Sequence, residues 1–308
     1  MSIPMETIIN QQSEIRSQKS VKEISDETLS NFGFYWREKN GVKVLVCRPL
    51  EEKGFVNGFS TRLGGVSDFP ENSLNLAGYN EDSAENIQEN RRRFLRVFYG
   101  DFRLASCWQV HSADVRVIKN FDDAKDGNYK MDALVSDVPN VLLGVKTADC
   151  VPILIGDTKT KTFAAVHAGW RGTVNSIVKN AIEKMRENYG TNAEDLISAI
   201  GAAACGGNYE VGQDVIDAFA EKFSTGEKLF TPTREGHALI DLHLANKEQL
   251  LNVGILPENI FTAPLCTIER TDLFFSYRVE KKLYGKTGRL MSVIGLKKSR
   301  QRQLAGCL

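Results

Sequence analysis

The 308-residue sequence has no net charge, no long apolar run and no paired spacing among its six cysteines. Its 39 basic side chains balance 39 acidic ones, so no whole-molecule field indicates a nucleic-acid partner. No apolar run approaches the ~20 residues that a membrane-spanning helix needs. Scattered cysteines are typical of reduced thiols in the cytoplasm. We therefore predict a cytoplasmic protein with neither a membrane nor a nucleic-acid partner.

The N-terminal segment lacks the basic and apolar regions of a secretory signal. It is polar, and we expect residues 1–30 to form a loose extension. The rest has the composition of an ordinary soluble globule, with 42% hydrophobic and 25% charged residues over the whole chain. We predict that residues 31–308 form a single domain.

Residues 132–173 are the most informative stretch. Three short apolar runs, Val141–Val145, Val151–Ile155 and Phe163–Val166, are bounded by turn residues and predict buried strands. A helix capped by Thr173 should follow, because its apolar residues have helical spacing. Elsewhere strands and helices alternate irregularly, which favours mixed sheets over a regular doubly wound fold.

Two further elements are predicted from local signals. Asn40-Gly41 lies between the apolar segments Phe32–Tyr35 and Val42–Cys47, which indicates a β-hairpin. A second helix should begin after Asp82 and end near Tyr99, with several arginines, including Arg91, facing solvent.

The residues best suited to chemistry are two histidines and one cysteine. His111, Cys150 and His167 fall at predicted strand ends or turns, among small and polar residues. Two imidazoles and one thiolate leave a fourth position open, as in catalytic zinc sites. From the residues alone, a buried thiol with two hydrogen-bonded histidines is an equally open interpretation. The other histidines, His237 and His243, are expected to be structural or solvent-facing.

The same residue types permit two other chemistries. A His₂Cys set could bind copper, but a multicopper oxidase needs more histidines than the two that remain, which argues against laccase chemistry. Alternatively, Cys150 or Cys205 could be a nucleophile activated by His167. Asp149 is poorly placed to assist Cys150, because neighbours on a strand point to opposite faces.

Arg62 and the adjacent turn Gly64-Gly65 have two interpretations. Glycine amides and a forked guanidinium can bind phosphate or carboxylate. The alternative is a surface turn with a solvated arginine.

Several motifs occur in one order from about Gly54 to Leu296. They are Phe59-Ser60-Thr61-Arg62, Gly64-Gly65-Val66-Ser67, Asn75-Leu76, Trp108-Gln109-Val110-His111, Thr147-Ala148-Asp149-Cys150-Val151-Pro152, His167-Ala168-Gly169-Trp170-Arg171-Gly172, Tyr209-Glu210-Val211-Gly212, Asp241-Leu242, Cys266-Thr267 and Phe275-Ser276-Tyr277-Arg278. In these motifs the chain resembles the laccase-domain family. That family was once labelled multicopper polyphenol oxidases and is now regarded as zinc-dependent purine nucleoside phosphorylases with adenosine deaminase activity.

The resemblance implies a fold and a site. The fold would be a layered α/β/β/α arrangement with mixed sheets in one domain. The implied zinc ligands, which are also catalytic, are His111, Cys150 and His167. The implied substrate-binding residues are Arg62, which would also be catalytic, Asn75, Cys266 and Arg278. One departure is Gly201-Ala202 where the family often has Gly-Pro, so we expect that loop to be looser.

The function implied by the resemblance is phosphorolysis of adenosine, inosine, guanosine or S-methyl-5'-thioadenosine to the base and ribose 1-phosphate, with deamination of adenosine. Zinc would lower the pKa of its bound water, and the hydroxide would attack C6 of adenine. Phosphate would attack C1′ of the ribose, positioned by Arg62 and the glycine amides. Copper in place of zinc is a less favoured alternative.

Two rival functions stay open. Bacterial relatives are called peptidoglycan editing factors, which suggests amide hydrolysis on cell-wall precursors by a Cys/His pair or zinc. A binding module without turnover is the other. The implied partners are purine nucleosides and phosphate, and the chain could be a monomer or a dimer.

Overall fold

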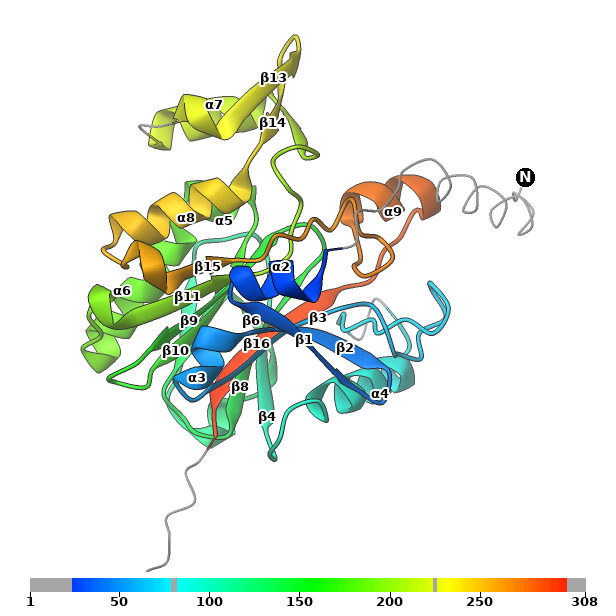
Figure 1. The fold of residues 1–308 in the computed structure, drawn as a ribbon, viewed down its shortest axis with the longest axis vertical. Helices are drawn as coiled ribbons and strands as arrows, with labels where there is room; N and C mark the ends of the chain where they lie inside the picture. Colours follow the sequence, from blue (N-terminus) through cyan, green and yellow to red (C-terminus); the bar gives the residue numbers. More distant parts are fainter. Residues whose placement is uncertain (1–23, 79–81, 224–225, 298–308) are drawn as a thin grey trace, which may run out of the picture.

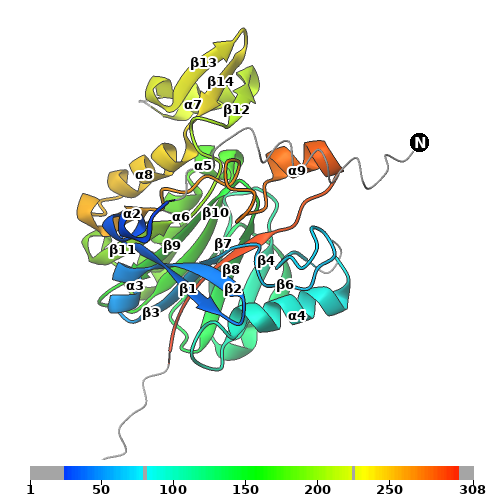
Figure 2. The same ribbon diagram turned by 45° about the vertical axis from the view of Figure 1, so that its right-hand side comes forward.

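The computed structural model describes residues 24–78, 82–223 and 226–297. Within these residues, two large β-sheets pack face to face and helices cover both outer faces (Figures 1 and 2). The α-helices are α2 (Asp26–Asn31), α3 (Arg48–Glu52), α4 (Ala84–Leu95), α5 (Trp170–Val174), α6 (Ile177–Tyr189), α7 (Gln213–Lys222), α8 (Leu242–Asn252) and α9 (Tyr277–Tyr284). Short 3-10 helices are η1 (Phe121–Asp123), η2 (Ala193–Asp195), η3 (Gly226–Leu229) and η4 (Pro257–Asn259).

The first sheet has seven strands in the order β1-β2-β3-β16-β8-β4-β6. Their bounds are β1 (Phe34–Lys39), β2 (Val42–Cys47), β3 (Phe55–Ser60), β16 (Leu290–Leu296), β8 (Val141–Thr147), β4 (Arg103–Trp108) and β6 (Asp126–Lys130). Strand β4 is parallel to both its neighbours, and the other pairs are antiparallel. The sheet is therefore mixed, as predicted.

The second sheet has six strands in the order β15-β11-β9-β10-β7-β5. Their bounds are β15 (Ile260–Thr262), β11 (Leu196–Ile200), β9 (Val151–Asp157), β10 (Phe163–Ala168), β7 (Ala133–Ser136) and β5 (Val115–Ile118). The outermost pairs are parallel and the inner ones antiparallel. The three predicted central strands are β8, β9 and β10, and their residues are almost all buried.

The apolar side chains form three buried clusters that define the layers. One lies between the two sheets and includes Leu143, Leu154 and Phe163. A second joins the outer face of the six-stranded sheet to α6 and α8, and a third joins the seven-stranded sheet to α4 through Phe94. This is the predicted α/β/β/α order.

A small three-stranded sheet stands apart from the layers at the top of both views (Figures 1 and 2). It consists of β12 (Glu210–Gly212), β14 (His237–Ile240) and β13 (Phe230–Arg234), with α7 beside it. Phe219 of α7 is buried in the same apolar cluster as α6 and α8, which ties this unit to the main layers.

Several local predictions need correction. The predicted helix after Thr173 is broken: Thr173 lies inside α5, and α6 starts after Ser176, whose left-handed backbone (φ 62°) separates the two. Helix α4 is capped by Ser83 and ends at Leu95, well before Tyr99. Arg91 is 7% exposed and donates to the Ala77 carbonyl, because its place on the helix faces the core.

Most of the predicted N-terminal extension, residues 1–23, lies outside the described residues, so that part stays a prediction. Residues 1–23 are not described, but Asp26–Asn31 form helix α2 with Ser25 as its cap. Leu29 of this helix is fully buried beside Phe34, so the ordered domain begins before residue 31. The predicted hairpin is confirmed as β1 and β2, with its first strand starting at Phe34.

Two connections cross from the first sheet to the second at the same edge of the molecule. Strands β4 and β8 are parallel neighbours, so their last residues lie close together. The chain then enters the second sheet as β5 after β4 and as β9 after β8. Polar residues on these crossovers are thus brought together. No helix among the described residues is long and apolar enough to span a membrane.

Candidate metal centre

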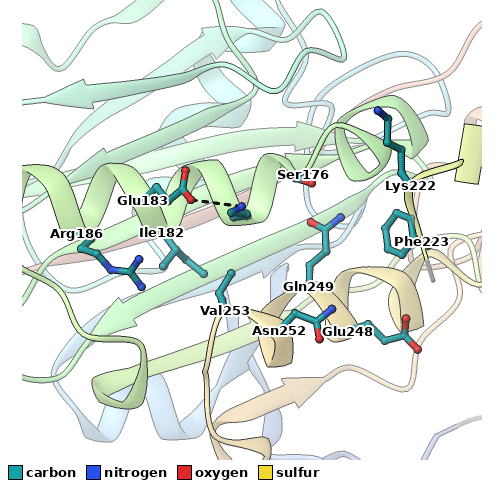
Figure 3. A pocket seen from close by; sticks show the side chains of 11 residues that line it. Ser176, Ile182, Glu183, Arg186, Lys222, Phe223, Glu248, Gln249, Asn252 and Val253 are labelled. Carbon is teal, nitrogen blue, oxygen red and sulfur yellow. Dashed lines mark ion pairs between the residues drawn. The ribbon is translucent and has the colours of Figure 1, made fainter. Parts of the chain in front are cut away.

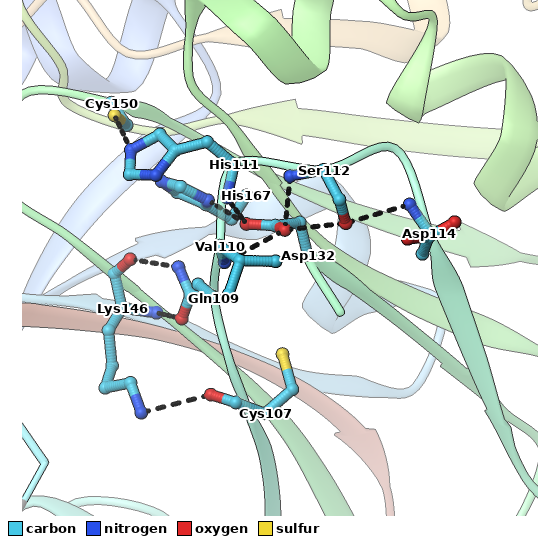
Figure 4. A network of polar contacts seen from close by, with 10 residues as sticks. All are labelled: Cys107, Gln109, Val110, His111, Ser112, Asp114, Asp132, Lys146, Cys150 and His167. Atoms are coloured by element: carbon cyan, nitrogen blue, oxygen red, sulfur yellow. Dashed lines mark hydrogen bonds and ion pairs between the residues drawn. The ribbon is translucent and has the colours of Figure 1, made fainter. Parts of the chain in front are cut away.

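The two crossovers and the end of β10 bring the predicted ligands together. His111 lies on the β4–β5 crossover and Cys150 on the β8–β9 crossover. The register of β9 and β10 pairs Ala168 with Val151, which places His167 beside the start of β9 (Figure 4). The ligand atoms of the three residues all lie within 4.8 Å of one another. The sequence spacing alone could not show this.

The start of the β4–β5 crossover is fastened to strand β8 by one amide side chain. Gln109 Nε2 donates to the Lys146 carbonyl at 2.6 Å, and the Lys146 N–H donates to Gln109 Oε1 at 2.8 Å (Figure 4). This reciprocal pair joins the chain just after β4 to Lys146, one residue before the end of β8. It holds the His111 loop at a fixed position relative to Cys150.

Asp132 is the residue that organises the centre, although no sequence motif predicted a role for it. Its carboxylate is fully buried and accepts three backbone N–H groups, from Val110 (3.2 Å), His111 (3.0 Å) and Ser112 (2.7 Å). These bonds hold His111 in the left-handed region, with φ 60°. Asp132 directly precedes β7, at the same sheet edge. The only sequence feature that could have indicated its role is that it is a lone acidic residue before an apolar run.

The same carboxylate orients His167. Asp132 Oδ1 lies 2.8 Å from His167 Nδ1, which leaves Nε2 of that ring to face Cys150 and His111. Metal-binding histidines usually have such a carboxylate or carbonyl partner on the second nitrogen. The rings of His111 and His167 meet edge to face, with centroids 4.9 Å apart.

Electrostatics favour a thiolate beside a charged imidazole when no metal is bound. Burial by itself would raise the pKa of the Cys150 thiol, but the His167 charge and the His111 hydrogen bond lower it to about 6. Burial would lower the pKa of His167, but the Cys150 thiolate and Asp132 raise it to about 9. Burial would likewise raise the pKa of Asp132, and its bonds to His167 and Ser112 keep it low.

Glycine is required at position 169 beside the ligands. A Cβ atom there would lie 2.8 Å from His111 Cδ2 and 3.1 Å from Cys150 Sγ. Gly169, two residues after His167 in the His-Ala-Gly-Trp motif, therefore leaves room for the two other ligands.

Asp149 faces away from Cys150. It has φ 83°, and its carboxylate accepts bonds from Thr267 Oγ1 (2.6 Å), Ser276 Oγ (3.0 Å) and the Arg278 N–H (2.6 Å). Burial raises its pKa despite these three bonds. Asp149 thus anchors two later segments of the chain to the ligand loop.

Comparison with known proteins identifies the family. The family model described as multi-copper polyphenol oxidoreductase laccase matches residues 56–297. The chain belongs to this family.

Relatives in this family have a consistent name. A Staphylococcus aureus protein named purine nucleoside phosphorylase SAR1163 is 34% identical over 262 residues, which is 82% of this chain and 95% of the relative. A purine nucleoside phosphorylase from Deinococcus radiodurans is 36% identical over 241 residues, 78% of this chain and 88% of that protein.

Solved structures share the fold. YlmD from Geobacillus stearothermophilus superimposes with a TM-score of 0.78 at 31% identity, covering 85% of this chain and 98% of that one. The Bacillus licheniformis protein YfiH gives a TM-score of 0.77 at 30% identity, covering 85% and 99%.

The copper in the laccase family's description has little support among the described residues. His237 Nδ1 lies 2.9 Å from the Glu235 carbonyl oxygen and His243 Nε2 lies 3.1 Å from that of Gly201. Neither belongs to a cluster of three possible ligands in the described part of the chain. The structure therefore offers one histidine-containing site of this kind there.

Arg62 is neither a solvated arginine nor part of an open anion-binding turn. It is 8% exposed, and its Nη1 contacts Glu280 Oε1 at 2.8 Å and the Thr271 carbonyl at 2.6 Å. A Cβ at Gly64 or Gly65 would lie 2.3 Å or 2.0 Å from a backbone oxygen, so these glycines serve close backbone packing. The Gly65 N–H donates to the Asn72 carbonyl.

The other predicted substrate residues have different surroundings. Asn75 is buried, and its Oδ1 accepts from the Ala77 and Arg289 N–H groups. Cys266 is buried beside Cys205, and its Sγ accepts the Cys205 N–H. Arg278 is exposed, stacks on the Tyr209 ring at 4.6 Å and donates to the Glu210 carbonyl at 2.7 Å. Of the four, Arg278 is the one exposed side chain.

The loop after β11 is not loosened by its Ala202. Residues Ala202, Ala203 and Ala204 are buried, and the Ala204 N–H donates to the Asp149 carbonyl at 2.9 Å. The predicted looseness is therefore wrong: the backbone bonds do not need proline.

A separate cavity of about 430 Å³ lies between α6 and α8 (Figure 3). Its polar lining includes Lys179, which pairs with Glu183 at 3.7 Å, and Gln249, whose Nε2 donates to the Thr173 carbonyl. None of its lining residues belongs to the His111–Cys150–His167 cluster, so we assign it no part in the chemistry there.

Proposed function

We propose that this member of the family is a zinc-dependent purine nucleoside phosphorylase that also deaminates adenosine. The observation that carries the proposal is the convergence of His111, Cys150 and His167, with Asp132 behind them. Relatives named purine nucleoside phosphorylase support the substrate class.

The three donors suit zinc. His111 Nε2 and Cys150 Sγ are 3.8 Å apart, and a tetrahedral zinc would place a nitrogen and a sulfur ligand about 3.6 Å apart. One thiolate and two imidazoles leave one position open to water or substrate. Bound zinc would supply a Lewis acid that activates water for attack at C6 of adenine.

The protein side chains supply positioning. Asp132 would keep the proton of His167 on Nδ1 and its Nε2 toward the metal. Burial, and then the Cys150 charge, raise the pKa of Tyr209, so its phenol stays protonated and can donate a hydrogen bond to a nucleoside. These residues hold the substrate side of the centre without taking part in bond breaking.

Arg278 is our candidate for binding phosphate. Its guanidinium carries five N–H donors, and the bond to the Glu210 carbonyl uses one nitrogen. Arg62 is held in its ion pair with Glu280, so its proposed role is to hold α9, which carries Arg278, in place. Phosphate on Arg278 would be oriented for attack on C1′ of the ribose.

The test is incubation of zinc-loaded protein with adenosine, with and without phosphate, and separation of the products. Adenine and ribose 1-phosphate that form only with phosphate would establish phosphorolysis, and inosine would establish deamination. If neither forms, the nucleoside proposal fails; nucleoside binding without turnover would favour a binding module.

One observation favours a second function. Cys150, His167 and Asp132 also have the order of a thiol nucleophile, its base and an orienting acid. Such a set could hydrolyse an amide, as in editing of peptidoglycan precursors. Metal-free protein that cleaves a peptidoglycan amide, loses this activity to iodoacetamide and retains it in His111→Ala would support this function over the metal-dependent one.

A further inference from the structure

A second group of sulfur and oxygen atoms lies outside the His/Cys centre. Strands β11 and β15 are parallel neighbours, and the pairing continues past their ends as a bridge between Ala203 and Cys266. This brings Cys205 next to Cys266, whose Sγ accepts the Cys205 N–H at 3.3 Å. Both sulfurs and a Glu269 carboxylate oxygen lie within 4.8 Å of one another.

One amide group is aimed at all three atoms. Asn208 Nδ2 lies 3.0 Å from Cys205 Sγ, 3.8 Å from Cys266 Sγ and 2.7 Å from Glu269 Oε1. An NH₂ group has two hydrogens, so it cannot bond fully to three acceptors. The two sulfurs and the Glu269 oxygen thus surround one point, and the NH₂ group of Asn208 occupies it.

The donor set has the chemistry of a metal site. Two sulfurs and a carboxylate oxygen are ligands that zinc accepts, and turning the Asn208 amide would offer its Oδ1 as a fourth. In a tetrahedral zinc site the sulfurs are about 3.8 Å apart and a sulfur and an oxygen about 3.6 Å, so the atoms need to close by no more than about 1.2 Å.

We propose that Cys205, Cys266 and Glu269 bind a divalent cation of the zinc class, at a second site independent of His111, Cys150 and His167. Binding displaces the thiol protons to solvent and moves the Asn208 amide off the central point. No redox step is involved.

The position of this second site gives it a structural consequence. The Thr267 N–H donates to the Ala203 carbonyl at 3.0 Å, and Ala204 and Thr267 both donate to Asp149. A metal on Cys205 and Cys266 would clamp these two loops, which in turn hold the residue before Cys150. The second site therefore braces the first without touching its ligands.

The experiment measures metal content. Full-length protein is purified under reducing conditions, stripped with a chelator, dialysed against Zn²⁺ and analysed by mass spectrometry of the elements. Wild type should retain about two zinc ions per chain, Cys205→Ser/Cys266→Ser about one and Cys150→Ala about one. A double variant that retains as much zinc as wild type overturns the proposal, and a Cys150→Ala variant that retains none overturns it as well.

A second variant covers the case in which the double serine variant fails to fold. Glu269→Gln changes an exposed side chain and keeps both sulfurs. It should lower the affinity of the second site for zinc about 10-fold or more. Glu258→Gln on η4 is the matched control. With Co²⁺ at the second site of Cys150→Ala, the near-ultraviolet thiolate absorption should reflect two sulfurs per cobalt. No cobalt–thiolate absorption in Cys150→Ala overturns the proposal.

Discussion

The metal centre and the Arg62–Glu280 ion pair are both buried polar clusters built from sequence motifs. They differ in whether their polar atoms can still bind a further ligand. In the centre, His111 Nε2 and Cys150 Sγ face each other in a long hydrogen bond of 3.8 Å. In the ion pair, Arg62 Nη1 alone meets three oxygen atoms, those of Thr271, Phe274 and Glu280. The first cluster can take a ligand, whereas the second closes on itself.

The two clusters are nevertheless connected through one segment. Arg62 and Glu280 fix the chain around α9, and Ser276 and Arg278 of that chain hold the Asp149 carboxylate. Arg62 therefore supports the centre from a distance. A charged residue in a motif can serve the site by placing other residues, without meeting the substrate.

The largest effect should come from Cys150→Ala. Removing the only sulfur ligand should abolish metal binding at this centre and lower kcat/KM for adenosine phosphorolysis by at least about 1,000-fold. The fold should survive, because Cys150 is half-buried on a crossover. Metal content, steady-state kinetics and thermal unfolding test this, with Cys47→Ala as a control that removes a thiol far from the centre. Full activity in Cys150→Ala would refute the assignment.

Next in size should be Glu280→Gln, which breaks the buried pair. We expect the free energy of unfolding to fall by about 3 kcal/mol, since an uncompensated guanidinium stays buried. Burial already lowers the pKa of Arg62 against the effect of Glu280. Metal content should change little, because Thr267 and Ala204 also hold Asp149 in place. Denaturant unfolding measures the loss, and Glu187→Gln, in an exposed pair, should leave the midpoint unchanged. A stable variant that has lost phosphate binding would instead make Arg62 a ligand contact.

Asp132→Asn should have an intermediate effect on the centre. The amide cannot accept from all of His167, His111 and Ser112, so the affinity for metal should fall about 10- to 100-fold. Competition with a chelating dye measures it. Asp157→Asn is the matched control, because that aspartate is buried at the far end of β9, where it accepts the Lys159 N–H, and its change should affect stability alone. Equal metal affinity in the two variants would show that Asp132 does not orient the metal ligands.

The smallest effect is that of a single pH unit on the affinity for metal. The pKa of His167 is about 9 without metal, so its Nε2 proton must leave before a metal can bind. Affinity for Co²⁺ should therefore rise about tenfold per pH unit up to about 9 and then level off. Below about 6, where Cys150 also takes up a proton, the slope should steepen. A flat profile between pH 7 and 9 would contradict the raised pKa of His167.

Local pattern was a good guide to the strands and a poor one to the polar residues. Apolar runs with turn residues between them indicated β8, β9 and β10, because burial on both faces needs continuous apolar sequence. Arg91 and Arg62 were misjudged because an arginine can be buried when backbone carbonyls or a carboxylate receive its N–H groups. Such partners lie far away in the sequence and leave no local signal.

The sequence by itself determined the mixed α/β class, the central strands and the residue types for a His₂Cys site, since these depend on local apolar periodicity and side-chain chemistry. The tertiary structure decided that His111, Cys150 and His167 meet, because their approach depends on strand register and on two crossovers at one sheet edge. It also decided that Asp132 orients them and that Cys205 and Cys266 are neighbours. These are contacts between distant segments, and only the packing of the two sheets fixes them.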